Sequence, residues 1–175
     1  MTPYAWQTAS MSVTIRAIAA EEWSLWRDLR LRALADSPDA FRSTLAEESA
    51  QPDEWWAEIL GTTAAHPRGE LWIAWLDGEA VGMLFGRVDR EYTVLEIGAM
   101  WVAPAARRAG VGSGLIQACV EWGRVCGAST ATLWATEVNR EAVAFYERHG
   151  FGPTESTEAL RPGSHLTVRR FQTAI

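Results

Sequence analysis

The alternation of apolar and polar residues predicts a strand and two helices in the first part of the chain. Residues 13–18 alternate with the period of a strand. The stretch 21–35 carries apolar residues at helical spacing and predicts an amphipathic helix. Residues 41–51 are polar and lack a period, which predicts an irregular segment. A short helix is predicted for 52–60, with Asp53 as a suitable cap, and a loop after it.

A meander of three strands is the clearest pattern in the middle of the chain. The predicted strands 70–76 and 80–88 flank Asp77-Gly78, a dipeptide typical of a tight hairpin turn. A third strand is predicted for 94–102. It leads into a glycine-rich stretch, residues 107–114, and then into a predicted helix over about 115–126.

The last part of the chain predicts a strand over 130–135, a helix over 139–149 and two further strands. One of these begins at Phe151 and the other covers 166–171. Helices and strands therefore mix around one sheet, which is an α/β class of fold, although the pattern does not give the order of the strands. We expect residues 12–175 to form one domain and residues 1–11 to form a flexible N-terminal extension.

Composition narrows the classes of function. Of the 175 residues 48% are hydrophobic and 22% are charged, and the net charge is −6, which argues against a general nucleic-acid binder. The acidic balance mildly favours a cationic second substrate. We find no apolar stretch of membrane-spanning length and no signal peptide, so the expected location is cytoplasmic, away from membranes. The three histidines are far apart and no metal-ligand spacing occurs, so no metal is expected.

Three glycines within five positions mark the junction between a predicted strand and a predicted helix, in Arg107-Arg108-Ala109-Gly110-Val111-Gly112-Ser113-Gly114. The first N–H groups of a helix lack intrahelical partners and favour anions, phosphate above all. The glycines also suit a turn with no ligand at all. A Walker loop is excluded because the sequence contains no lysine, and the spacing does not give the dinucleotide fingerprint.

Two motifs together resemble the GNAT family of N-acetyltransferases. Arg107-x-x-Gly110-x-Gly112 is similar to the family's acetyl-CoA signature between its fourth strand and third helix. Asn139-x-x-Ala142-x-x-Phe145-Tyr146-x-x-x-Gly150-Phe151 resembles the helix and strand that follow. The resemblance implies a central, mixed, mostly antiparallel sheet of six to seven strands with about four helices. It also implies a bulge in the fourth strand, which splays from the fifth.

The resemblance implies acetyl-CoA (coenzyme A) as the co-substrate. Its pyrophosphate would bind the backbone of the glycine-rich stretch, and its pantetheine arm would lie beside the fourth strand. The implied cofactor-binding residues are Met100, Trp101, Val102, Arg107, Arg108, Ala109, Gly110, Val111, Gly112, Ser113, Gly114, Asn139, Ala142, Phe145 and Tyr146.

Three residues are implied to be catalytic. Tyr146 would protonate the leaving thiolate, and an N–H group at Met100 would stabilise the oxyanion. Glu96 would accept a proton from the amine through water. The alternatives are that Tyr146 only packs beside Phe145, that Glu96 points to solvent or forms a salt bridge, and that ordered water is the base. Cys119 and Cys126 fit a buried helix face, which argues against a cysteine nucleophile.

The acceptor is expected to be a small-molecule or peptide amine bound by the first two helices and the loop before the last strand. Phe41, Trp55 and Trp56 are candidate contacts. A homodimer is common in the family. Two other classes stay open at this point: an acyl-CoA-binding sensor that lacks catalysis, and a nucleotide-binding α/β module.

Overall fold

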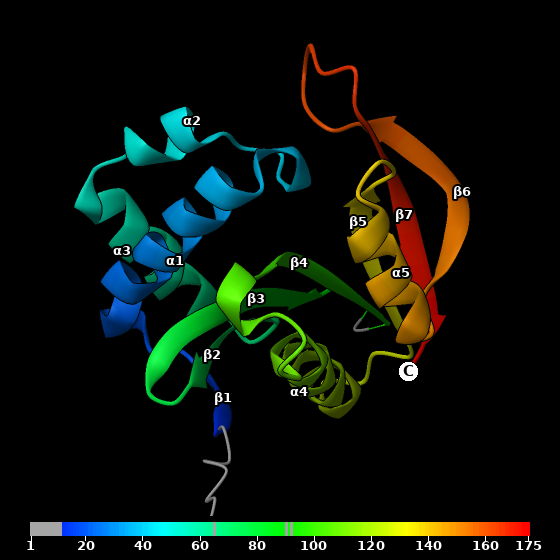
Figure 1. The fold of residues 1–175 in the computed structure, drawn as a ribbon. Coiled ribbons are helices and arrows are strands. Elements are labelled where there is room, and N and C mark those ends of the chain that lie inside the picture. The colour runs from blue at the N-terminus through cyan, green and yellow to red at the C-terminus, as the bar shows by residue number, and fades with distance from the viewer. Residues whose placement is uncertain (1–11, 65, 90, 92) are drawn as a thin grey trace, which may run out of the picture.

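A single sheet of seven strands runs through a computed structural model of the protein, which describes residues 12–64, 66–89, 91 and 93–175. The strand order is β1-β2-β3-β4-β5-β7-β6 (Figure 1). The strands are β1 Val13–Ala17, β2 Gly69–Leu76, β3 Glu79–Val88, β4 Val94–Val102, β5 Thr130–Thr136, β6 Gly152–Ala159 and β7 Thr167–Ala174. The extension expected at residues 1–11 lies outside the described residues.

The described residues form five α-helices and three short 3-10 helices. The α-helices are α1 Trp23–Asp36, α2 Leu45–Ser49, α3 Asp53–Ala64, α4 Val111–Val125 and α5 Arg140–Arg148. The 3-10 helices are η1 Ala20–Glu22, η2 Pro38–Ala40 and η3 Pro104–Ala106. Helix α4 packs on β3 and its neighbours, while α1 and α3 cover β2 and β3 from the other face of the sheet (Figure 1).

The predicted fold class is confirmed, with one more helix than expected. The sheet is mixed and mostly antiparallel, and its one parallel pair is β4 with β5. The expectation of an irregular segment over 41–51 was wrong, because α2 lies within it. Thr44 caps this helix by accepting from the Glu47 N–H at 3.2 Å, and the Glu47 carboxylate accepts in return from the Thr44 N–H at 2.7 Å. This reciprocal cap fixes a short helix without apolar periodicity.

Two helix boundaries also differ from the prediction. Helix α3 continues through Gly61 to Ala64, where a loop was expected. Helix α4 begins at Val111 rather than near Leu115, because Gly110 adopts a left-handed conformation (φ +83°) and forms the N-cap. The helix therefore starts inside the glycine-rich stretch.

The expected bulge and splay both lie in β4. Met83 pairs with Trp101 and Phe85 pairs with Gly98, so Ala99 and Met100 together oppose the single residue Leu84. Ala99 has a positive φ of 50°, as bulge residues can have. On its other side β4 pairs with β5 only over Val94–Ile97 and Thr130–Leu133, although both strands continue. We call the divergence of Gly98–Val102 from Trp134–Thr136 the split.

Candidate functional site

The N-terminus of α4 faces open space at Gly110. The first helical hydrogen bond here runs from the Gly114 N–H to the Gly110 carbonyl at 3.0 Å. The N–H groups of Val111, Gly112 and Ser113 precede it and have no partner within the helix. A side chain at Gly110 would meet no atom within 4 Å. This turn is therefore open to a ligand and suited to an anion.

The other two glycines of the stretch are explained by packing. A Cβ atom at Gly112 would lie 3.2 Å from Phe145 Cζ and 3.3 Å from Met100 Cε. A Cβ atom at Gly114 would overlap Ile15 Cδ1. Gly110 is therefore the glycine that the turn needs for its backbone conformation, while Gly112 lets α5 and the β4 bulge approach α4.

The two arginines at the start of the stretch differ in their surroundings. Arg107 donates from Nη2 to Asp36 Oδ2 at 2.5 Å and from Nε to the Val102 carbonyl at 3.0 Å. Trp101 Nε1 donates to the same carboxylate at 2.9 Å. Burial alone would raise the pKa of Asp36, but the bonds from Trp101, Ser37 and Arg107 outweigh it and lower the pKa. Arg107 thus joins the turn to the end of α1, whereas Arg108 is exposed.

Tyr146 and Met100 are brought into contact at the bulge. The Tyr146 hydroxyl donates to Met100 Sδ at 3.6 Å. The ring of Phe145 lies edge-on to that of Tyr146, with 5.4 Å between the centroids. Tyr146 is half-buried, and burial raises its pKa to about 12. At neutral pH the phenol therefore stays protonated and can donate a proton, but it cannot act as a base.

Asn139 has a structural role at the start of α5. Its side-chain oxygen accepts from the Ala142 N–H at 3.1 Å and caps the helix. The N–H of Ala142 is thereby occupied. Any contact of these two residues with a cofactor would use other atoms.

Glu96 lies on the face of the sheet opposite to α4 and is paired with an arginine. Arg87 of β3 donates to Glu96 at 2.6 Å, and the Glu96 side chain is 44% exposed. Leu95 and Ile97, its neighbours in β4, are buried towards α4. The expected alternation of Val94, Glu96 and Gly98 on one face holds up to the bulge.

We call this side of the sheet, at the split, the acceptor face. It carries the side chains of Glu96, Thr132, Trp134, Thr136 and Arg170. Pairing of Glu96 with Thr132 and of Trp134 with Arg170 places them on one face. The predicted base therefore lies beside polar groups of β5 and β7.

The segment after α1 covers part of the acceptor face. Thr136 Oγ1 donates to the Asp39 carbonyl at 2.6 Å. From the β6–β7 connection, Arg161 Nη1 donates to the carbonyls of Pro38 and Phe41 at 3.0 and 2.9 Å. Three parts of the chain are thereby held together at the split.

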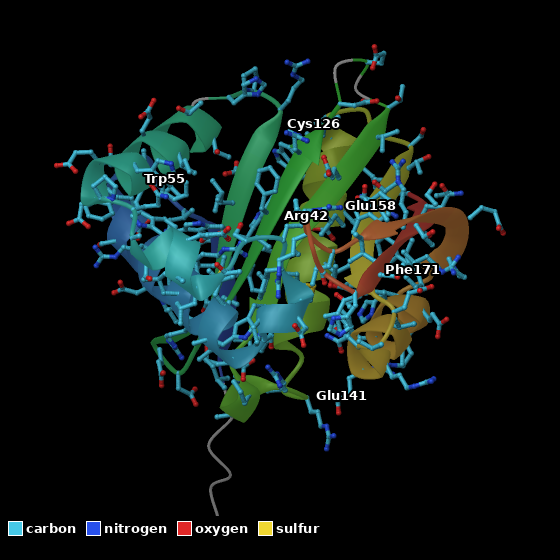
Figure 2. The ribbon with its side chains drawn as sticks, turned by 90° about the horizontal axis from the view of Figure 1, so that it is seen from above. Arg42, Trp55, Cys126, Glu141, Glu158 and Phe171 are labelled. Carbon is cyan, nitrogen blue, oxygen red and sulfur yellow. The ribbon has the colours of Figure 1, made fainter. Side chains whose placement is uncertain are left out.

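One ion pair spans the same region. Arg42 pairs with Glu158 of β6, and the two side chains lie together in Figure 2. The Arg42 guanidinium also lies 5.7 Å from the Trp134 ring centroid. Charged groups therefore border the acceptor face on the side of β6.

The three aromatic residues expected to contact an acceptor lie in different places. Phe41 is buried, and the Arg30 guanidinium lies 4.5 Å from its ring centroid. Trp56 is also buried, and Trp55 lies edge-on against it at 4.9 Å. Both tryptophans belong to α3, which contacts α1, β2 and η1. The structure thus brings the backbone of Phe41 to the acceptor face but does not bring Trp55 and Trp56 there.

The acidic residues of α2 are engaged within the protein. Glu47 caps the helix, and Glu48 is buried in a bidentate pair with Arg30, with contacts of 2.7 and 2.9 Å. The Glu48–Arg30 pair fastens α2 to α1.

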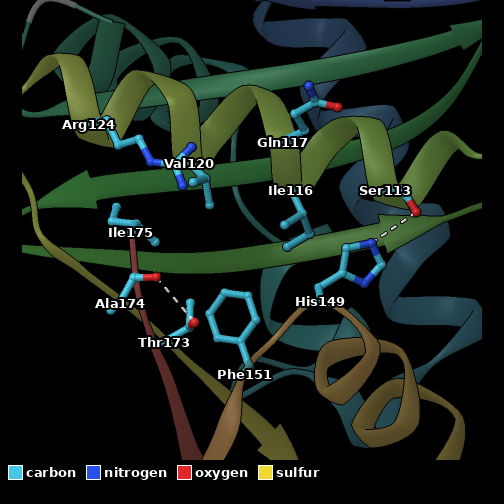
Figure 3. A pocket seen from close by; sticks show the side chains of 10 residues that line it. All are labelled: Ser113, Ile116, Gln117, Val120, Arg124, His149, Phe151, Thr173, Ala174 and Ile175. Atoms are coloured by element: carbon cyan, nitrogen blue, oxygen red, sulfur yellow. Dashed lines mark hydrogen bonds between the residues drawn. The ribbon is translucent and has the colours of Figure 1, made fainter.

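A groove of about 300 Å³ runs beside α4 and reaches the glycine turn (Figure 3). Its lining includes Ile116 and Val120 of α4 and Phe151, the residue before β6. At one end His149 Nε2 lies 3.0 Å from Ser113 Oγ, and its Nδ1 lies 2.8 Å from the Phe145 carbonyl. A carbonyl only accepts, so Nδ1 carries the proton. This contact fixes the end of α5 against the first turn of α4.

Sequence reasoning missed Thr132, Trp134 and Arg170 as members of this region. Their roles depend on contacts between distant segments, such as the contact of Thr132 with Arg170, which are 38 positions apart. One signal was available: four polar or aromatic residues alternate with apolar ones along β5, which places them on one face.

The part of the chain that the structure describes has neither a metal-binding cluster nor a membrane-crossing helix. No group of three or more histidine, cysteine, aspartate or glutamate side chains is placed to hold a metal ion there. Among the described helices, none has the length and apolar character needed to cross a membrane. Cys119 and Cys126 are free thiols, and burial raises the pKa of both.

Curated relatives of the chain include several acetyltransferases. The mycothiol acetyltransferase of Streptomyces avermitilis is 26% identical over 87% of this chain and 47% of its own length. The Mycobacterium tuberculosis protein named probable N-acetyltransferase Rv2775 is 25% identical over 91% of this chain and 87% of its own length. The chain spans about half the length of the mycothiol acetyltransferases that it matches.

Solved structures share the fold at low identity. An acetyltransferase of the GNAT family from Streptococcus pneumoniae has a TM-score of 0.79 at 18% identity, over 94% of this chain and 99% of its own. The yncA protein from Salmonella typhimurium, solved with its cofactor acetyl-CoA, has a TM-score of 0.75 at 15% identity, over 95% of this chain and 94% of its own. A family model for the acetyltransferase (GNAT) family matches residues 23–151. With the split, the bulge and the glycine turn in place, the chain belongs to the GNAT family of acetyltransferases.

Proposed function

We propose that the protein is an N-acetyltransferase that moves the acetyl group of acetyl-CoA directly to a primary amine in a ternary complex. The observation that carries the proposal is the meeting of three features at one place. They are the free edge of β4 at the split, the open N-terminus of α4, and the protonated Tyr146 hydroxyl at Met100. Together these can bind an anion, an extended chain and a leaving thiolate.

The chain's own residues fit coenzyme A. The unpartnered N–H groups of Val111, Gly112 and Ser113 suit a pyrophosphate, and the open space at Gly110 gives it access. On the side that faces β5, Gly98–Val102 pairs with no described strand, and this edge suits an extended arm that adds to it. Arg108 adds charge at the turn, while Arg107 holds the turn against Asp36.

Acetyl-CoA supplies an activated thioester. In the proposed reaction the amine nitrogen forms a bond to the acetyl carbon, and the carbon–sulfur bond breaks. A backbone N–H near Met100 stabilises the oxyanion, and Tyr146 gives its proton to the leaving thiolate. The proton that the attacking nitrogen loses as the amide forms restores the Tyr146 phenol through water. The ammonium group of the acceptor must first lose a proton, which Glu96 accepts through water.

The role of Glu96 is consistent with its ion pair. Arg87 Nη2 lies 2.6 Å from Glu96 Oε2 and orients the carboxylate, and 44% of the Glu96 side chain remains exposed to water. The alternative is that ordered water alone accepts the proton. Replacing Glu96 with Gln distinguishes these two bases, because kcat falls strongly only if the carboxylate is the base.

The experiment that tests the function measures free-thiol release from acetyl-CoA in the presence of primary amines. The panel covers polyamines, amino acids, amine-bearing antibiotics and peptide N-termini. We expect turnover with at least one class, and mass spectrometry should find one added acetyl group on the amine. Tight binding of coenzyme A with no turnover on any amine would overturn the proposal and favour an acyl-CoA sensor.

A further inference from the structure

The arginines near the acceptor face are balanced by carboxylates, with one exception. The balanced pairs are Arg42 with Glu158, Arg87 with Glu96, Arg161 with Asp39, and Arg169 with Glu137. Arg170 of β7 is half-buried, yet no carboxylate of the described residues lies within 4.0 Å of it. A half-buried cation without a counter-ion is unusual in a folded protein.

The hydrogen bonds of the Arg170 side chain are incomplete as well. Nη2 donates to Thr132 Oγ1 over a long distance of 3.4 Å. Nε is buried and has no partner. Nη1 also has no partner among the described residues. Unlike Nε, it is not fully buried. The guanidinium therefore has a free donor that can reach a ligand.

Arg170 lies at the mouth of the split. It pairs with Trp134, the first residue of β5 beyond the last pairing with β4 at Leu133. Thr132, to which it donates, is paired with Glu96. The uncompensated cation and the proposed base therefore stand on the same face, with Thr132 between them.

We propose that Arg170 binds a carboxylate of the acceptor, so that the acceptor is an amino acid or a similar small amine that carries a carboxylate a few bonds away. A carboxylate matches the planar donor pair of a guanidinium and supplies the missing counter-charge. With the carboxylate on Arg170, the amine lies towards Glu96 and the split. Glu96 cannot replace this ligand, because Arg87 occupies it.

This inference rests on the proposed function and is tested with matched acceptors. Each amino acid is compared with the amine that lacks its carboxylate and with its carboxamide. We expect wild-type kcat/KM to be at least about 30-fold higher for the acid than for either partner, the effect of one desolvated charge pair. Equal or better rates with the amines that lack the carboxylate would overturn the inference and leave the acetyltransferase function intact.

Variants of Arg170 give the second arm of the test. Arg170→Gln should lower kcat/KM for the acid at least about 30-fold, and should change the rate with the decarboxylated amine less than about 3-fold. Arg170→Lys keeps the charge and should retain part of the preference. Arg148→Gln removes an exposed arginine of α5 that does not line the groove beside α4, and it should leave both rates unchanged. Equal losses on both acceptors in Arg170→Gln would contradict a carboxylate contact.

A binding measurement does not depend on turnover. Calorimetric titration with the free amino acid, in the presence of coenzyme A, should show binding to the wild type and to Arg170→Lys and none to Arg170→Gln. Thermal stabilisation by coenzyme A should be the same in all three and shows that each is folded. Failure of all amines in the thiol assay, with this stabilisation present, would instead reject the acetyltransferase function.

Discussion

At the scale of single residues, the environment of Tyr146 decides what its side chain can do. The phenol is half-buried between Phe145, Phe151 and Met100, and its pKa is raised to about 12. The hydroxyl therefore keeps its proton in the neutral range and can donate it there. Burial alone, without the help of a nearby charge, keeps this group protonated.

Replacing Tyr146 with Phe tests this role directly. We expect kcat to fall by about 100-fold with little change in the KM for acetyl-CoA, because the ring still packs and only the proton donor is lost. The measurement is thiol release under saturating acceptor. A variant with wild-type kcat would leave Tyr146 as a packing residue.

The same substitution changes the dependence of stability on pH. The folded pKa of about 12 lies above the ordinary value of 10.0, so the protonated form is favoured in the folded state. This stability is fully present below pH 10 and is lost as the pH rises through 12, by up to roughly 2–3 kcal/mol. Urea unfolding between pH 9 and 12 should show a steeper loss in the wild type than in Tyr146→Phe.

Single residues also mark the limit of prediction from sequence. The contact of Tyr146 with the β4 bulge follows the family pattern, and the cap formed by Asn139 follows local chemistry. The partner of Arg107 does not follow from either. Its charge is committed to Asp36, a residue of another element, and only the folded chain brings the two together.

At the scale of elements, α4 lies close to the sheet because glycines in the strands and in the helix leave room for it. A Cβ atom at Gly86 of β3 would lie 2.6 Å from Cys119 Sγ and 3.0 Å from Trp72 Cζ3. The space that a Cβ atom would need at Gly123 of α4 is likewise occupied by the Leu95 side chain. The position of α4 in turn determines where its N-terminus lies relative to the split.

We therefore expect Gly86→Ala to destabilise the protein by roughly 1–3 kcal/mol through overpacking. Gly61→Ala is the matched control, because Gly61 is in α3 and a Cβ atom there would meet nothing within 4 Å. The control should stabilise the protein by about 0.5–1 kcal/mol through helix propensity. Chemical denaturation of both variants measures the difference. Equal effects of the two changes would mean that α4 does not depend on the space at Gly86.

Elements with an apolar period could be predicted, and α2 could not. The strands of the meander and the helices α1 and α4 have apolar faces that pack on the sheet. Helix α2 is five residues long and its one buried residue is charged. The pattern that predicts this helix is the Thr44-x-x-Glu47 capping box. A prediction from apolar spacing alone does not detect it.

At the scale of the whole molecule, the sheet is narrowly joined at its centre. The part with β1–β4 and the part with β5–β7 pair over four residues of each strand. The bonds from Thr136 and Arg161 to the segment after α1 connect the parts across the acceptor face. A ligand bound in the split would contact both parts and so stabilise the whole fold.

Coenzyme A at about 100 times its Kd should accordingly add about 2.7 kcal/mol to the free energy of unfolding. For a domain of this size the melting temperature should rise by about 5–10 °C. Gly110→Glu should abolish the shift, because it places bulk and negative charge at the open end of α4. Differential scanning calorimetry makes the comparison. An undiminished shift in Gly110→Glu would move the pyrophosphate site away from this turn.

The order of the strands is the part of the whole fold that local pattern could not give. Strand β7 lies between β5 and β6, so the last strand of the chain enters the interior of the sheet. This placement brings Arg170 beside Trp134 and next to the split. The position of the residue that we propose to select the acceptor therefore depends on the order of the strands. The conformation of the glycine turn depends on local sequence.

The extra residue of the β4 bulge has a consequence for how the protein can change by deletion. Ala99 holds a left-handed conformation that costs an alanine about 1–3 kcal/mol, and the bulge interrupts the ladder to β3. Removing this one residue would restore an uninterrupted pleat, with Trp101 still opposite Met83 and Gly98 still opposite Phe85.

We expect the shortened protein to unfold at the same or a higher denaturant concentration. It should neither bind coenzyme A nor release thiol from acetyl-CoA, because a straight β4 can pair with β5 along its whole length and close the split. Denaturation and calorimetry of the same sample would establish both. Activity would then depend on a strained bulge that selection for stability alone would remove. A relative without the bulge would be more stable and inactive.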